Sequence, residues 1–420
     1  MSQPARLLAR PAITPAARRR DALGLVRAGR RQEAAALCLA IIDEDDDGRQ
    51  WLAGQVVAAM EQPDLSFAGD LAEILTAIER GSAWSPAWMG GVTRPIVDAS
   101  LSSGKLHHDL QQLQHLRYKD GAMPLDDIIA HYEAAIARLA RLGVSRAPLT
   151  REDQGTIGQA YGRLLHVAGA PRVAHALSPS WDRQQVQRSY LDSRPHVVVI
   201  DDFLSAEALA GLLHFCQDST IWAGNRYAHG RLSSLFFTGF NAPLVLQIAE
   251  EIRDACPLLI GERHPLRQAW AFKNTEVLPG GCSTHADFAA VNVNFWITPD
   301  DANLDPDSGG MVVYDLEAPL SWSFGQYNER ADLIGELMAK QRPRAIRIPY
   351  RQNRAIIFNS DLFHETEAVC FRPDYLSHRI NVTMLYGDRR ADEHHTEPAP
   401  QSTGPAAWRS AALIRRRRAP

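Results

Sequence analysis

The spacing of apolar residues changes near residue 190, and this change constrains the fold more than any other feature of the sequence. Before it, apolar residues recur at helical spacing, most clearly between Leu71 and Ile78. After it, short runs rich in β-branched and aromatic residues alternate with turns that contain glycine. We therefore predict an α+β protein. The predicted divisions are a flexible basic N-terminus at 1–20, a helical region at 21–190, a β region at 191–388 and a disordered tail at 389–420.

Two helices of the first region have predicted boundaries. Asp70 and Glu73 resemble a capping box at the start of the first helix. A second helix is predicted over about residues 125–142. Gly81 and Gly143 follow the last turns of these helices, where a left-handed residue is commonly needed. Both helices therefore have a start, an apolar stripe and a stop.

The stretch 25–42 looks like part of a tetratricopeptide repeat, because Gly29 is followed by Glu33 and an apolar helix. The sequence has no regular period of about 34 residues, so an ordinary helical bundle is an equal alternative. In either case we predict that the N-terminal third consists of helical hairpins.

Beyond residue 190 the sequence predicts a helix that opens at Ser205, followed by regularly spaced short strands. Strands of this kind, separated by glycine-rich turns, indicate a sandwich or a barrel. The predicted strands are 197–200, 269–274, 291–297, 311–314, 345–348, 355–359 and 380–386.

Composition excludes several classes of protein. With 45 basic and 49 acidic residues, the net charge of -4 is too small and too evenly spread to predict nucleic-acid binding. The longest apolar runs are far shorter than the ~20 residues that span a bilayer, so we expect no membrane insertion. The five cysteines lie far apart and form no Cys-x-x-Cys pair, and no signal peptide is recognisable. We therefore expect a cytoplasmic protein.

One segment places an imidazole and a carboxylate two residues apart, at His285 and Asp287. On a strand, the period of two would direct both side chains to one face. A third candidate ligand, His364, stands just past the buried strand 355–359, after a short turn at 361–363. Two histidines and one carboxylate on one face of a metal are the arrangement of non-haem Fe(II) oxygenases.

The His-x-Asp pattern alone is weak evidence, and the chain contains its own control. His107 and Asp109 show the same spacing within a helical stretch, where side chains two residues apart point in different directions. We therefore predict that this second pair does not bind a metal. His285 and Asp287 differ because a glycine turn precedes them and a strand follows.

Residues 196–388 resemble the Fe(II)/2-oxoglutarate-dependent dioxygenases. The resemblance is carried by His285-x-Asp287, by the downstream His364 and by Arg379. The segments 308–314 and 353–360 also look like the double-stranded β-helix of that family. With its helical region included, the chain is similar to the bacterial tetratricopeptide-associated members.

This resemblance implies a role for individual residues. His285, Asp287 and His364 would hold Fe(II), and the guanidinium of Arg379 would pair with the distal carboxylate of 2-oxoglutarate. Polar side chains in neighbouring strands are further candidates for binding the cosubstrate. These are Asn381, which shares a strand face with Arg379, together with Asn274, Asn292 and Asn294.

The expected activity is an O2-consuming dioxygenase reaction that releases succinate and CO2. Hydroxylation of an unactivated C–H bond is the usual outcome in the family, and the substrate would be an amino acid, a peptide or protein side chain, or a natural-product intermediate. Asp287 argues against the halogenating members, which lack this carboxylate, whereas desaturation and ring formation remain open.

Two alternatives also remain open. The first is a silent metal-binding β-helix whose helical region mediates protein interaction. The second is a cupin that does not use 2-oxoglutarate.

Overall fold

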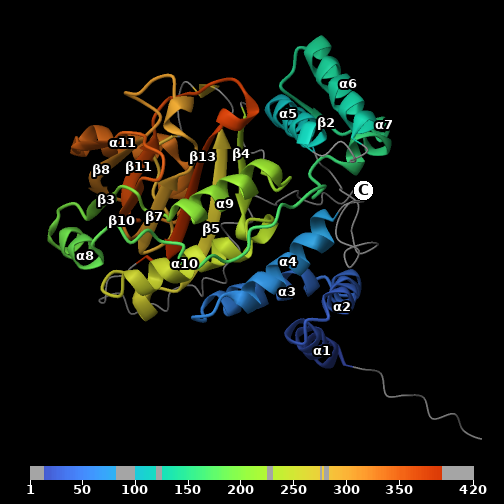
Figure 1. Ribbon diagram of the computed structural model, residues 1–420, viewed down its shortest axis with the longest axis horizontal. Coiled ribbons are helices and arrows are strands. Elements are labelled where there is room, and N and C mark those ends of the chain that lie inside the picture. The colour runs from blue at the N-terminus through green and yellow to red at the C-terminus, as the bar shows by residue number, and fades with distance from the viewer. Residues whose placement is uncertain are drawn as a thin grey trace, which may run out of the picture.

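The computed structural model describes residues 14–81, 100–119, 125–224, 230–274, 277–278 and 283–389. Within these residues, the region after residue 190 contains a six-stranded antiparallel sheet, which we call the major sheet (Figure 1). Its strands, from one edge to the other, are β3 (Val197–Ile200), β10 (Ala355–Asn359), β7 (Val291–Trp296), β13 (Arg379–Tyr386), β5 (Leu266–Asn274) and β4 (Arg231–Leu235).

A second, minor sheet faces the inner side of the major sheet. Its strands, in spatial order, are β11 (Leu362–Thr366), β8 (Met311–Glu317) and β9 (Ala345–Ile348), and a separate short pair joins β12 (Val369–Cys370) to β6 (Val277–Leu278). Buried residues of the two sheets, such as Phe358 and Val313, form one apolar cluster between them. From β7 the chain crosses to β8 and β9 of the minor sheet, returns to β10, crosses again to β11 and finally returns to β13, which is the arrangement of a jelly roll. This arrangement fits the predicted double-stranded β-helix.

All the predicted strands are present, and β9 and β10 have the predicted bounds. The prediction that His364 stands just past a turn is wrong, because this residue lies inside β11. Strand β11 pairs with β8, and Leu362 lies opposite Glu317 while His364 lies opposite Val313. The register shifts between these two pairs, and β11 begins directly after the turn at 360–361.

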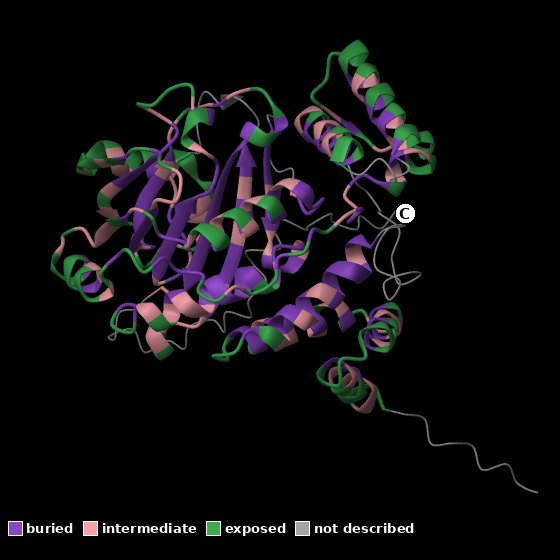
Figure 2. Ribbon diagram, viewed as in Figure 1, coloured by how far each residue is buried: buried purple, intermediate pink, exposed green. Residues whose placement is uncertain are grey.

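Helices cover the outer face of the major sheet. α9 (Ala206–Asp218) and α10 (Pro243–Ala255) lie across this face (Figure 1), and the strands beneath them are buried (Figure 2). The predicted opening of a helix at Ser205 is confirmed, because its hydroxyl accepts a hydrogen bond from the N–H of Ala208.

The N-terminal helices continue the same apolar core. They are α1 (Pro15–Arg27), α2 (Arg31–Glu44), α3 (Gly48–Met60) and α4 (Ser66–Arg80). Buried residues of these helices, such as Leu75, belong to one cluster with Leu246 of α10 and Met384 of β13. Apolar packing is therefore continuous across residue 190. The tetratricopeptide likeness and the domain boundary both stay predictions.

Arg80, the last residue of α4, ties these helices to the rest of the protein. Its buried guanidinium donates hydrogen bonds to the carbonyl oxygens of Gly162 at 2.9 Å and of Thr220 and Ile221 at 3.0 Å, and also to that of Thr238. Burial lowers the pKa of Arg80 to about 10, which still leaves the guanidinium charged at neutral pH.

The predicted helix boundaries are partly wrong. Helix α4 begins at Ser66, so Asp70 lies inside it and pairs with Arg31 at 2.9 Å instead of capping the helix. Gly81 ends α4 with a φ of -49°, which is not left-handed. The predicted end of the second helix is confirmed, because α6 (Asp126–Leu142) ends at Gly143 with a left-handed φ of +65°.

The other helices and strands are β1 (Ser100–Ser102), α5 (Ser103–Lys119), β2 (Arg146–Pro148), α7 (Arg151–Gly155), α8 (Arg183–Asp192) and α11 (Ala331–Gln341). Residues of β1, α5, α6 and β2 form a second, smaller apolar cluster. Among the described residues, no helix combines the length and apolarity needed to cross a bilayer.

Part of the predicted flexible N-terminus is helical. Helix α1 begins at Pro15, and the hydroxyl of Thr14 caps it by accepting a hydrogen bond from the N–H of Ala17. Residues 1–13 and the tail from residue 390 lie outside the described residues, so the predictions made for them stay predictions.

Candidate metal centre

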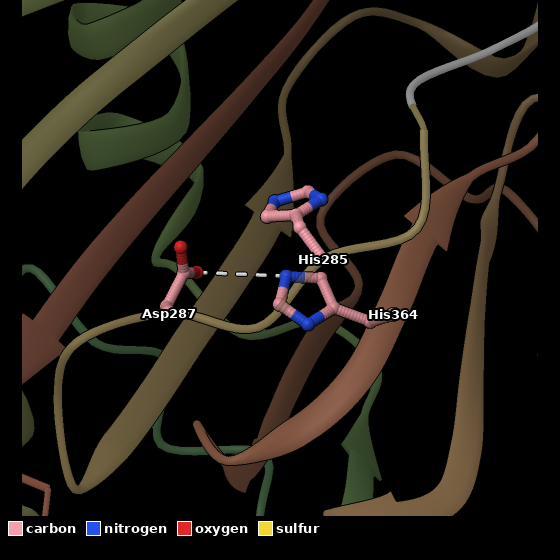
Figure 3. A group of neighbouring side chains, drawn as sticks. All are labelled: His285, Asp287 and His364. Carbon is pink, nitrogen blue, oxygen red and sulfur yellow. Dashed lines mark ion pairs between the residues drawn. The ribbon is translucent and has the colours of Figure 1, made fainter. Parts of the chain in front are cut away.

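Three predicted ligands come together at the edge of the minor sheet. His285, Asp287 and His364 offer ligand atoms that all lie within 4.8 Å of one another (Figure 3). Nε2 of His364 lies 3.5 Å from a carboxylate oxygen of Asp287, and the centroids of the two imidazole rings lie 4.5 Å apart. Across the described residues, this is the single group of three such side chains that could hold a metal ion.

Backbone hydrogen bonds hold the three residues in place. His285 and His364 form an isolated antiparallel bridge, in which each N–H donates to the carbonyl oxygen of the other residue, at 3.0 and 2.9 Å. The N–H of Asp287 donates to the carbonyl oxygen of Ser360 at 3.1 Å. The expected strand around His285 is thus reduced to one bridging residue, and Asp287 lies in the loop that leads to β7.

The two imidazoles are oriented by carbonyl oxygens. Nδ1 of His285 lies 2.8 Å from the carbonyl oxygen of Ser283, and Nδ1 of His364 lies 3.0 Å from that of Leu362. A carbonyl oxygen can only accept, so we assign a proton to Nδ1 of each ring. Nε2 is then the ring atom that would bind a metal, and metal binding would release any proton that it carries.

Asp287 is ionised although it is only 4% exposed. Burial raises the pKa of this carboxyl group, but its hydrogen bond to His364, the nearby charge of both imidazoles and a hydrogen bond from Asn292 together lower it below its usual value. Nδ2 of Asn292 lies 2.7 Å from the carboxylate. Two imidazoles and an ionised carboxylate are a donor set that suits Fe(II).

The predicted cosubstrate residue Arg379 lies on the inner face of β13 and is 1% exposed. Its Nε donates to the carbonyl oxygen of Gly309 at 2.7 Å, and its Nη1 donates to Oδ1 of Asn381 at 3.2 Å. These contacts fix the plane of the guanidinium. Asn381 therefore orients Arg379, a role that its position in the sequence could not reveal.

The other predicted asparagines divide between two environments. Register places Asn274 beside Arg379, and Asn294 beside Thr383, whose hydroxyl accepts a hydrogen bond from Asn294 at 2.8 Å. Asn292 contacts the metal ligand Asp287, as described above. Several buried polar atoms on this face have no partner among the described residues. They are both amide atoms of Asn274, Oδ1 of Asn294 and Nε1 of Trp296.

Unpaired buried polar atoms are rare in folded proteins. The two unpaired donors, Nδ2 of Asn274 and Nε1 of Trp296, together with the charge of Arg379, fit an anionic ligand in the interior of the jelly roll. The side chains at this site thus suit both a metal ion and a carboxylate-bearing cosubstrate.

Comparison with known proteins was made at three levels. No family model and no curated protein matches this sequence. Three solved structures illustrate the structural matches. The non-haem α-ketoglutarate-dependent carbocyclase SnoK from nogalamycin biosynthesis has a TM-score of 0.34 at 11% identity, covering 51% of this chain and 87% of its own. The Pseudomonas putida prolyl-4-hydroxylase has a TM-score of 0.32 at 14% identity, covering 50% and 100%.

The third example is EctD from S. alaskensis with 2-oxoglutarate and 5-hydroxyectoine, at a TM-score of 0.33 and 15% identity, covering 53% and 84%. All these TM-scores lie below 0.5, so the argument for function rests on the residues of the site. The matched structures are Fe/2-oxoglutarate-dependent enzymes, the superfamily that the sequence motifs resemble.

Proposed function

We propose that this protein is an Fe(II)- and 2-oxoglutarate-dependent dioxygenase. One observation carries the proposal: the ligand atoms of His285, Asp287 and His364 meet within 4.8 Å, and Nδ1 of each imidazole lies against a carbonyl oxygen. Three protein ligands leave the remaining coordination positions for cosubstrate and O2. Bound iron and 2-oxoglutarate supply the oxidising chemistry, and the protein supplies orientation and exclusion of water.

Arg379 would bind the distal carboxylate of 2-oxoglutarate. Its guanidinium is planar and is held by Gly309 and Asn381, so little conformational entropy remains to be lost when the carboxylate binds. The unpaired Nδ2 of Asn274 is placed to donate a hydrogen bond to the same ligand, whereas Nδ2 of Asn294 already donates to Thr383. Arg379, oriented by Asn381, and Asn274 would hold the cosubstrate in one orientation relative to the metal.

Hydroxylation of a C–H bond is the reaction that this site supports best. Asp287 would supply the third protein ligand, a carboxylate that the halogenating members of the resembled family lack. The substrate class that we propose is an amino acid, a peptide or protein side chain, or a natural-product intermediate, and succinate and CO2 would be the coproducts.

The first experiment is an anaerobic titration of the protein with Fe(II) and then 2-oxoglutarate, followed by visible absorption. We expect a metal-to-ligand charge-transfer band in the wild type and no band in His364→Ala. His107→Ala is the matched control, because it removes an exposed histidine from the other His-x-Asp pair and should leave the band intact. Folded wild-type protein without the band would contradict the proposal and favour a silent scaffold.

Arg379→Ala tests the cosubstrate assignment separately. Removing one partner of a buried charge pair typically costs about 2–5 kcal/mol, so we expect 2-oxoglutarate affinity to fall by about 30-fold or more. Fe(II) affinity, measured by calorimetry, should change little, because the hydrogen bonds described for Arg379 go to Gly309, Gly310 and Asn381. Unchanged 2-oxoglutarate affinity would instead support a cupin that works without this cosubstrate.

A further inference from the structure

A cavity of about 610 Å³ lies against the outer face of the minor sheet, beneath helix α11. It begins next to the metal centre, because its lining includes Thr284, which precedes His285, and Glu365, which follows His364. Side chains alternate across an extended backbone, so Thr284 and Glu365 point away from the metal. The cavity is therefore separate from the interior in which we place 2-oxoglutarate.

The lining of this cavity is about equally polar and apolar, and an apolar part lies between α11 and β8. Val312 of β8 and Ile334 of α11 are buried, and Met338 of α11 is half-buried beside them. Gly335 completes the wall on the helix side, and a Cβ atom added there would meet no other atom within 4 Å. A slender aliphatic chain could thus lie between α11 and the sheet.

One carboxylate supplies the uncompensated charge of the cavity. Glu365 accepts hydrogen bonds from the hydroxyl of Thr284 and from that of Tyr314, the latter at 2.8 Å. Burial and the neighbouring Glu365 carboxylate raise the pKa of Tyr314 to about 12, so Tyr314 stays a donor at neutral pH. Both donors are neutral. Within the described residues no ion pair joins Glu365 to a basic side chain.

The single cation of the lining is already paired. Arg347 forms an ion pair with Glu367 at 2.5 Å, and its side chain is 72% exposed whereas that of Glu367 is 7% exposed. Glu367 also accepts a hydrogen bond from the N–H of Gly310. Two carboxylates and one guanidinium leave one net negative charge, and that charge lies on Glu365 within reach of the apolar part of the lining.

We propose that this cavity binds an aliphatic chain that ends in a cationic nitrogen, such as an alkylammonium group or a lysine side chain, with Glu365 as its counter-ion. The hydrocarbon part would contact Val312, Ile334 and Met338, and the charged end would meet the carboxylate. A site one residue away from two metal ligands would anchor a distant part of a substrate. That substrate role rests on the proposed dioxygenase function, whereas the binding itself does not.

The test uses the full-length protein without iron, so that its failure is distinct from failure of the dioxygenase proposal. Hexylamine, which is charged at pH 7, and 1-hexanol, which has the same length and no charge, are titrated by calorimetry. We expect one molecule of hexylamine to bind at least tenfold more tightly than hexanol, and we expect this advantage to shrink at high salt. Equal affinity for the two probes would overturn the proposal.

Two variants locate the site. Glu365→Gln keeps the size of the side chain and removes its charge, so hexylamine affinity should fall to that of hexanol. Gly335→Leu should block both probes without unfolding the protein, because the new side chain extends into open space from a helical position. Glu336→Gln is the matched control, because it removes a charge from the exposed side of the same helix. Unchanged hexylamine binding in Glu365→Gln would overturn the assignment.

A structural role for Glu365 gives a different result. If the carboxylate served only to hold the loop before His285, Glu365→Gln would weaken metal binding and wild-type protein would not distinguish the two probes. We expect Zn(II) affinity to be the same in Glu365→Gln and the wild type. Replacing hexylamine by Nα-acetyl-lysine methylamide separates the two sources of the cation, since tighter binding of the latter identifies a peptide.

Discussion

His107-x-Asp109 in helix α5 and His285-x-Asp287 beside strand β7 share one sequence pattern but have different surroundings. In α5, the exposed ring of His107 bonds the carbonyl oxygen of Ser103 at 2.8 Å, while Asp109 is directed into the protein. In the second pair, both side chains approach His364. Helix α5 points the side chains of its His-x-Asp pair in different directions. The backbone bridge between His285 and His364 instead brings His285 and Asp287 close to the third side chain.

The two aspartates are also neutralised differently. Asp109 forms an ion pair with Lys105 at 2.7 Å and accepts hydrogen bonds from His108 and Tyr132. Asp287 has imidazoles and one amide around it, and no lysine or arginine forms an ion pair with it among the described residues. A buried carboxylate that already has an ammonium partner does not need a metal. The identity of its partners therefore separates a structural pair from a candidate metal site.

The largest expected effect concerns the metal. Asp287→Ala should reduce Fe(II) affinity more than 100-fold, because even residues that only support a ligand typically change metal affinity by about 10–100-fold. Asp109→Asn should leave the affinity and the 1:1 stoichiometry unchanged. Anaerobic calorimetry measures both variants. Weaker metal binding in Asp109→Asn would break the distinction between the two pairs.

The second effect concerns stability, and here the change at Asp109 should matter more than the change at Asp287. Asp109→Asn leaves the buried ammonium of Lys105 without its counter-ion, so we expect the free energy of unfolding to fall by about 3–5 kcal/mol. Asp287→Ala should change it much less in the metal-free protein. Urea denaturation followed by circular dichroism gives both values. A larger loss in Asp287→Ala than in Asp109→Asn would contradict this assignment of roles.

A smaller effect is expected at the amide that supports the metal ligand. Asn292→Ala removes the hydrogen bond to Asp287 and should lower Fe(II) affinity by about 10–100-fold. Asn294→Ala is the control on the same strand, because Asn294 contacts Thr383 and not Asp287. Equal metal affinity in the two variants would show that the orientation of Asp287 does not depend on Asn292.

The smallest effect is a dependence of stability on pH around Asp109. Lys273, His108 and His378 are buried there, and Nζ of Lys273 lies 3.6 Å from the ring centroid of Tyr375. Burial and the charge of Lys273 lower the pKa of His108 to about 4 and that of His378 to about 2. Burial lowers the pKa of Lys273 itself well below its usual value, although Cys216, Asp109 and Asp218 oppose this shift.

These bases are protonated in the unfolded chain at pH values where the folded protein keeps them neutral. The free energy of unfolding should therefore rise with pH, and between pH 5 and 6.5 each of the two histidines contributes up to about 1.4 kcal/mol per pH unit. The histidine contribution ends near pH 6.5, whereas the lowered pKa of Lys273 adds a rise that continues until the pH passes the unfolded pKa of lysine, about 10.4. Lys273→Met should reduce the slope above pH 8, measured by urea denaturation. An identical slope in this variant would show that Lys273 is charged in the folded protein.

The sequence was most informative where a pattern repeats. Strands β3, β9 and β10 were predicted with their bounds, because short runs rich in β-branched residues between turn residues have few other solutions. The three candidate metal ligands and their context were also recognisable in the sequence, and the structure brings them together. The start of α4 could not be predicted from the sequence, because Asp70 resembles a cap but pairs with Arg31, which is distant in sequence.

Contacts between distant segments account for the rest. The hydrogen bond from Asn292 to Asp287 depends on the loop that leads to β7, and the cavity at Glu365 depends on where α11 lies over the minor sheet. His378 is 1% exposed and has no hydrogen-bond partner among the described residues. His378 is buried because α5 covers that end of the sheet, and no local sequence pattern predicts this contact.

The guanidinium of Arg80 has a consequence for the mobility of the N-terminal helices. Four carbonyl oxygens from three separate segments converge on it, so swinging α1–α4 away would leave one buried cation and four acceptors without partners at once. The N-terminal helices are therefore fastened to the rest of the protein and do not act as a hinged cover. The proposed dioxygenase activity should accordingly be insensitive to a cross-link that locks α4 to α10.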